Sequence, residues 1–135
     1  MPRVLPRLTA DTSNASSKLP TRVAIWLLDS PRLGHAPSVK RFAGRLLKQP
    51  AREGEVLAQS RLGQMLCRDC GNPRDRRMGM ELLRHAARAG DSHAPLELGR
   101  YYLKPRHNEP QRARYWLELA AARGSQEAKK LLDEV

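Results

Sequence analysis

The chain has 135 residues, of which 40% are hydrophobic and only 4% aromatic, and its formal net charge is +11. This length fits one domain, whose core must be built mainly on Leu, Ala and Met. The longest apolar stretch, Val23 to Leu28, is far shorter than the roughly 18 residues that a membrane-spanning helix needs. Contact with a membrane is therefore not expected.

Residues 1–20 are expected to form a disordered leader. They contain Pro2, Pro6 and Pro20 together with a cluster of Ser, Thr and Asn, a composition that buries little apolar surface. The continuous apolar segment of a secretory signal is missing. A cytoplasmic location is expected, and cysteines are mostly thiols in that reducing compartment.

From residue 21 onward, apolar residues recur with a helical period, which predicts short helices in pairs. The first helices of the pairs are predicted near residues 21–29, 55–68 and 92–103. The second helices are predicted near residues 38–49, 75–89 and 110–123. A further helix near residues 126–134 is expected to cap the stack by covering the apolar face of the last pair.

Two motifs repeat in phase at intervals of about 35 residues, the spacing typical of stacked helix pairs. The first motif is Ala-x-x-x-Leu, at Ala24/Leu28, Ala58/Leu62, Ala94/Leu98 and Ala128/Leu132. The second is a small residue followed three positions later by a large apolar one, at Ala43/Leu46, Gly79/Leu82 and Ala113/Trp116. Each full unit then closes with a glycine, at Gly54, Gly90 and Gly124.

These residue types suit the packing of helix pairs. Ala and Gly at a crossing point let two helices approach to roughly 8 Å, and Leu or Trp fills the seam between them. The closing glycine is typical of a left-handed helix cap. In the first unit, Pro50 replaces a small residue, so we expect the second helix there to kink or end early.

The combined motif resembles the Sel-one-like repeat, a relative of the tetratricopeptide repeat. The unit from Ala94 to Gly124 matches best, with Leu98-Gly99, Trp116 and Ala120-Ala121 in place. The resemblance assigns residues 21–135 to one repeat domain. Its units lie near residues 24–54, 58–90 and 94–124, with a partial unit at 128–135.

The resemblance implies an all-α solenoid of about three helix-pair repeats with a C-terminal capping helix. It also implies an adaptor that binds a partner protein or peptide in a concave groove. In tetratricopeptide relatives the inner groove face would include Gln64, Arg68, Arg100 and Lys104 here. Three of these four are cationic, which favours an acidic partner; ordinary solvated side chains are the alternative.

The aromatic residues Tyr101, Tyr102 and Trp116 are expected in the core, because they occupy packing positions of the repeat. A ligand-binding aromatic cluster is the alternative interpretation. His85 is expected to face solvent.

The net charge leaves a nucleic-acid-associated protein as the alternative function. Against it, the charges are dispersed along the sequence without a long basic block. The aromatic residues are also too few for a platform on which bases stack.

Cys67 and Cys70 form the one spacing that suggests chemistry. A single C-x-x-C pair is a weak signal, because structural zinc takes four ligands and a second pair is absent. A redox pair, a metal site and ordinary thiols all stay open. No catalytic triad or phosphate-binding loop can be assembled, so no enzymatic activity, cofactor or metal is expected.

Overall fold

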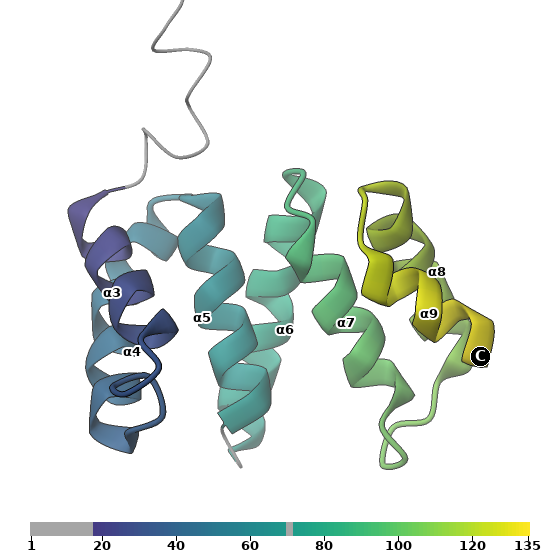
Figure 1. Cartoon of the computed structure of the whole chain (residues 1–135), viewed down its shortest axis with the longest axis horizontal. Helices are drawn as coiled ribbons and strands as arrows, with labels where there is room; N and C mark the ends of the chain where they lie inside the picture. Colours follow the sequence, from purple (N-terminus) through teal and green to yellow (C-terminus); the bar gives the residue numbers. More distant parts are fainter. Residues whose placement is uncertain (1–17, 70–71) are drawn as a thin grey trace, which may run out of the picture. The chain divides into compact units, whose positions relative to one another are not determined.

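The computed structural model of the chain describes residues 18–69 and 72–135 (Figure 1). These residues form helices and their connections, without a strand among them, which confirms the all-α class. The helices are α3 (Leu19–Asp29), α4 (Pro37–Arg52), α5 (Val56–Asp69), α6 (Pro73–Arg88), α7 (His93–Leu103), α8 (Pro110–Ala122) and α9 (Gln126–Glu134). None of them combines the length and apolar character that crossing a bilayer requires.

The helix positions follow the predicted ones, with ends that differ by less than one turn. A leader is predicted over residues 1–20. Of these, residues 1–17 lie outside the described residues, and α3 begins at Leu19.

The expectation that α4 ends early at Pro50 is wrong. The helix continues to Arg52, and the Pro50 carbonyl accepts the backbone N–H groups of Glu53 and Glu55 at 3.1 and 3.0 Å. The proline removes one helical hydrogen bond from α4. Its ring is also fully buried, so it contributes packing in return.

The chain divides into two compact units, with the boundary between Glu55 and Val56 in the sequence. In the N-terminal unit, α3 packs against α4. Ala24, Ala43 and Leu47 are fully buried between them. The backbone N–H of Lys18 donates to the Glu55 carboxylate at 2.9 Å, which ties the start of α3 to the turn after α4.

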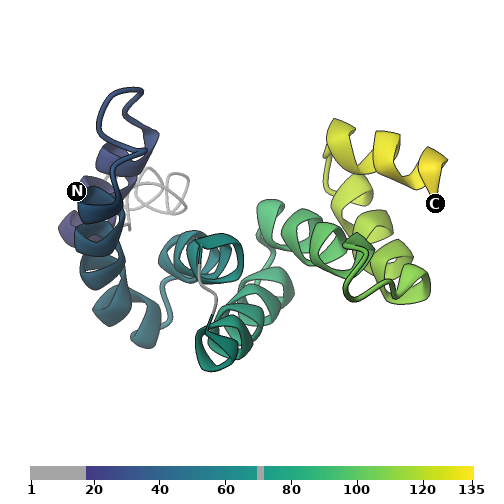
Figure 2. The same ribbon diagram turned by 90° about the horizontal axis from the view of Figure 1, so that it is seen from below.

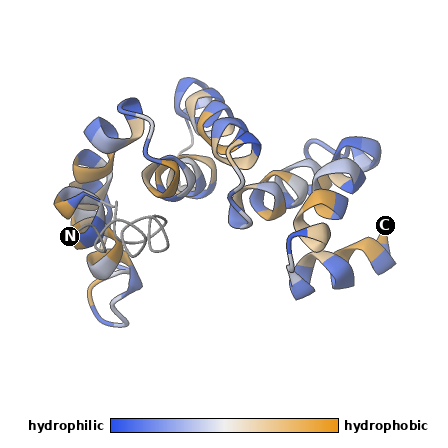
Figure 3. Ribbon diagram, turned by 90° about the horizontal axis from the view of Figure 1, so that it is seen from above, coloured by the Kyte–Doolittle hydropathy of each residue, from blue (hydrophilic) through white to orange (hydrophobic). Residues whose placement is uncertain are grey.

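In the C-terminal unit, each helix from α5 to α9 packs against the next, and α5 also contacts α7 (Figure 2). Leu83, Leu98 and Leu117 are fully buried at the centre of this core, among a set of buried alanines. Hydrophobic residues lie on the helix faces that meet, and hydrophilic residues lie on the outer faces (Figure 3). Stacked repeats are expected to pack in this way, with each helix against the next and with contacts between the first helices of neighbouring pairs.

Glycines sit where helices cross closely, as the motif predicts. A Cβ atom added to Gly63 would lie 3.0 Å from the carbonyl oxygen of Gly79, and one added to Gly79 would lie 3.0 Å from that of Gly63. A Cβ on Gly99 would lie 2.6 Å from the side chain of Leu117. The closing glycines have φ angles of 91°, 106° and 102°, which confirms the predicted left-handed caps.

The aromatic residues Tyr101, Tyr102 and Trp116 differ in how far they are buried. Tyr102 is buried, whereas Tyr101 and Trp116 are partly buried against the same core. Trp116 meets the exposed Tyr115 edge to face, with ring centroids 5.0 Å apart. The core assignment therefore holds fully for Tyr102 and partly for the other two.

Candidate binding cleft

A cleft of about 420 Å³ opens in the C-terminal unit between α5, α7 and the segment that leads into α9. Three of the predicted inner-face residues line it together: Gln64, Arg68 and Arg100. Its charged lining also includes Glu97, Arg123 and Glu127. Helix stacking thus brings together side chains that lie far apart in the sequence.

Glu97 forms the floor of this cleft and is only 8% exposed. Arg68 donates from Nε to Glu97 Oε1 at 3.0 Å, and its Nη2 donates to Oε2. Arg100 donates from Nη1 to the same Oε2 at 2.8 Å. A buried carboxylate needs such charge-assisted partners, because an unpaired charge in the interior is costly.

Arg100 also pairs with Glu127 of α9, whose side chain is 53% exposed. The two arginines therefore face two carboxylates, one buried and one exposed. Both predicted cations are therefore paired with acids of the same unit, which the sequence analysis did not foresee.

The carboxylate at position 97 was missed by the sequence reasoning, although a signal was present. Glu97 stands between Leu96 and Leu98 on a predicted core helix, three residues before Arg100. A charged residue among buried apolar ones is normally paired, so its position already pointed to an ion pair.

A hydrogen-bonded network holds Gln64 at the edge of the cleft. Gln64 donates from Nε2 to Ser60 Oγ at 3.3 Å, and the buried Ser60 donates to Asp91 Oδ2 at 2.9 Å. The same Asp91 oxygen accepts the backbone N–H groups of His93 and Ala94 at 3.0 and 2.7 Å. Asp91 therefore caps the start of α7 while it orients the edge of α5.

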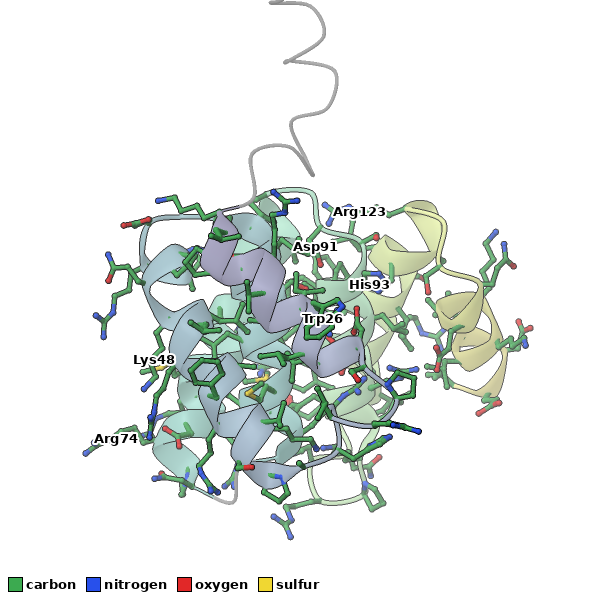
Figure 4. The ribbon with its side chains drawn as sticks, turned by 60° about the vertical axis from the view of Figure 1, so that its left-hand side comes forward. Trp26, Lys48, Arg74, Asp91, His93 and Arg123 are labelled. Atoms are coloured by element: carbon green, nitrogen blue, oxygen red, sulfur yellow. The ribbon has the colours of Figure 1, made fainter. Side chains whose placement is uncertain are left out.

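Arg123 lines the cleft but is engaged with the backbone. Its Nη1 donates to the carbonyl oxygens of Ala87 and Asp91 at 2.7 and 2.8 Å. These bonds fasten the end of α8 to the turn between α6 and α7; Figure 4 labels Asp91, His93 and Arg123 in this region. Arg123 is therefore a structural residue of the cleft wall.

Lys104 lies apart from the other three predicted residues. It lines a neighbouring cleft of about 490 Å³, together with Arg106 and His107, and Arg68 borders both clefts. Lys104 Nζ is 5.8 Å from the ring centroid of Tyr101, which stacks on His107 with centroids 4.1 Å apart.

A third cleft, of about 500 Å³, lies beside Tyr102 and Arg84. Arg84 donates from Nη2 to the Tyr102 hydroxyl at 3.2 Å and from Nη1 to Glu81 Oε1 at 3.0 Å. Burial lowers the pKa of Arg84, but these hydrogen bonds outweigh it and raise that pKa above its ordinary value. The guanidinium therefore stays charged and acts as a clamp between α6 and α7.

The Cys67–Cys70 pair is only half within the described residues. Cys67 is buried, with Sγ 4.0 Å from the carbonyl oxygen of Arg76, and Cys70 lies outside the described residues. Within the described ranges, no three His, Cys, Asp or Glu side chains gather closely enough to hold a metal ion. His85 is exposed, as predicted.

No protein-family model matches the sequence, and no curated protein matches it either. Among solved structures, a Sel1 repeat protein from Oxalobacter formigenes is similar, with 29% sequence identity and a TM-score of 0.62. The alignment covers 98% of this chain and 99% of that one. The resemblance predicted from the repeat motif is thereby confirmed.

Proposed function

Since the chain shares the all-helical fold of a Sel1 repeat protein along nearly its whole length, we propose that it is a protein-interaction module. In this proposal, α3–α4, α5–α6 and α7–α8 are three helix-pair repeats, and α9 covers the last pair. The module acts as a cytoplasmic adaptor. It binds an acidic segment of a partner protein in the cleft between α5, α7 and α9.

The pairing of Arg100 carries this proposal. Its contact with buried Glu97 fixes the guanidinium in place, while its contact with Glu127 lies at the exposed side of the cleft. A planar guanidinium held in this way is suited to a carboxylate. A carboxylate of the partner can therefore take the place of the Glu127 carboxylate with little reorganisation of the site.

Arg68 supports the same interpretation. Its side chain is 53% exposed, and only its Nε and one terminal nitrogen are used on Glu97. A guanidinium has five N–H donors. Because Arg68 borders both neighbouring clefts, its remaining donors can serve a peptide bound there.

Lys104 extends the proposed contact surface. It is exposed and carries no carboxylate partner among the described residues. A peptide that crosses the edge at Arg68 would reach Lys104 in the adjoining cleft. Gln64 adds an amide at the opposite edge, where it can hydrogen-bond to the peptide backbone.

Replacing Glu127 with Gln tests the proposal by a gain of affinity. The change removes the competing charge at Arg100 and leaves the Glu97 pair intact. We expect an acidic peptide to bind several-fold more tightly to Glu127→Gln than to the parent, as measured by the fluorescence anisotropy of a labelled Asp- and Glu-containing peptide.

The matched control is Glu118→Gln, because Glu118 is exposed on α8 outside the cleft lining. It changes net charge equally and should leave the affinity unchanged. Equal gains in both variants would mean that general electrostatics governs binding. An unchanged affinity in Glu127→Gln would refute the role given to Arg100.

A further inference from the structure

Helix α4 carries four cations at helical spacing. Its sequence, PSVKRFAGRLLKQPAR, contains no acidic residue. Arg41, Arg45, Lys48 and Arg52 follow one another at steps of four, three and four residues. Residues at such steps share one helix face, so these dispersed charges form a single row, here named the α4 cationic row.

All four side chains of the row are exposed, and Lys48 projects outward from α4 (Figure 4). No carboxylate of the described residues forms an ion pair with any of them. The opposite face of α4 is buried against α3 through Ala43, Leu47 and Ala51. The packing of α4 on α3 therefore leaves the row exposed, with its positive charges not neutralised by carboxylates of the described residues.

We propose that the α4 cationic row binds the phosphate backbone of duplex nucleic acid without reading its sequence. At a rise of 1.5 Å per residue, the row is about 16 Å long. A duplex carries one negative charge per roughly 1.7 Å of its axis, so about ten phosphates lie along an equal length. Four regularly spaced cations can each neutralise one of them.

A membrane surface, a partner protein and a single-stranded nucleic acid each fit this face less well than a duplex does. A helix that binds a membrane surface inserts an apolar face between the lipids, and the apolar face of α4 is already buried in the unit. Protein interfaces centre on aromatic or apolar anchors in pockets, whereas the row holds only charges. Single strands bind by base stacking, and Phe42, 50% exposed, is the sole aromatic residue of α4.

This surface is separate from the proposed peptide cleft. The row belongs to the N-terminal unit, and the cleft belongs to the C-terminal unit. Either proposal can therefore fail without the other.

The salt dependence of duplex binding tests whether the α4 cationic row contacts the phosphates. The probe is a labelled duplex of about 20 base pairs, titrated with the full chain between about 50 and 200 mM salt. Four phosphate contacts give a slope of log K against log salt of about −3.6, or roughly a hundred-fold loss of affinity over this range. The double variant Arg45→Gln/Lys48→Gln should make the slope shallower by about 1.8.

The control pair is Lys129→Gln/Lys130→Gln, which removes the same charge from exposed positions of α9. It should retain the parent slope, and circular dichroism should show equal melting for all three proteins. An equal loss of slope in the control would overturn the proposal in favour of a diffuse basic field. Tighter binding of a single strand, or equal binding of phosphatidylserine vesicles, would also overturn it.

Discussion

Glu97 determines the charge of the candidate cleft through contacts that sequence spacing reveals only in part. Its pairing with Arg100 spans three residues of one helix and could be predicted. Its pairing with Arg68 spans 29 residues and depends on how α5 and α7 pack. The inner-face prediction therefore grouped two cations that line one cleft, but it missed the carboxylate that both of them bind.

The contact between Gly99 and Leu117 yields a stability prediction for a single residue. Gly99→Leu forces a side chain into space that Leu117 already fills. Overpacking of this kind costs about 1–3 kcal/mol, so we expect a lower free energy of unfolding by urea denaturation. Ala122→Leu, at an exposed position of α8, should change stability little. Equal effects of the two changes would contradict the close crossing of α7 and α8.

At the scale of helices, the sequence predicted most of what the structure shows. Helical periodicity and the closing glycines place all the described helices, because both follow from local backbone and packing rules. The effect of Pro50 was misjudged because the burial of its ring depends on tertiary packing. The α4 cationic row is not visible as a basic block in the sequence, because its charges are separated by three or four residues and align only once the helix forms.

Replacing Trp116 with Ala tests how much the packing of α8 against the core contributes to stability. Truncating a large aromatic residue costs about 3–5 kcal/mol in a full core, and Trp116 is only partly buried. We therefore expect Trp116→Ala to destabilise by about 3 kcal/mol, the lower end of that range. Trp26→Ala is the matched comparison, because Trp26 is 67% exposed on α3. Thermal melting that ranks Trp26→Ala as the more damaging change would contradict this packing.

At the scale of the whole molecule, the repeat pattern predicted the fold class and the similarity to a Sel1 repeat protein. It did not predict the division into two compact units at Glu55 and Val56. That division falls at the end of the first unit, close to Pro50, which replaces a small residue of the motif. The two proposed binding surfaces lie on different units and differ in the ligand that they suit.

The most direct test of the central claim is to map where an acidic peptide binds on the full chain. Backbone amide signals would be followed by NMR while the labelled chain is titrated with the peptide. We expect the largest shifts at Gln64, Arg68, Glu97, Arg100 and Glu127, with little change along α4. Shifts concentrated on α4, or spread evenly over the exposed cations, would contradict a peptide-binding cleft between α5, α7 and α9.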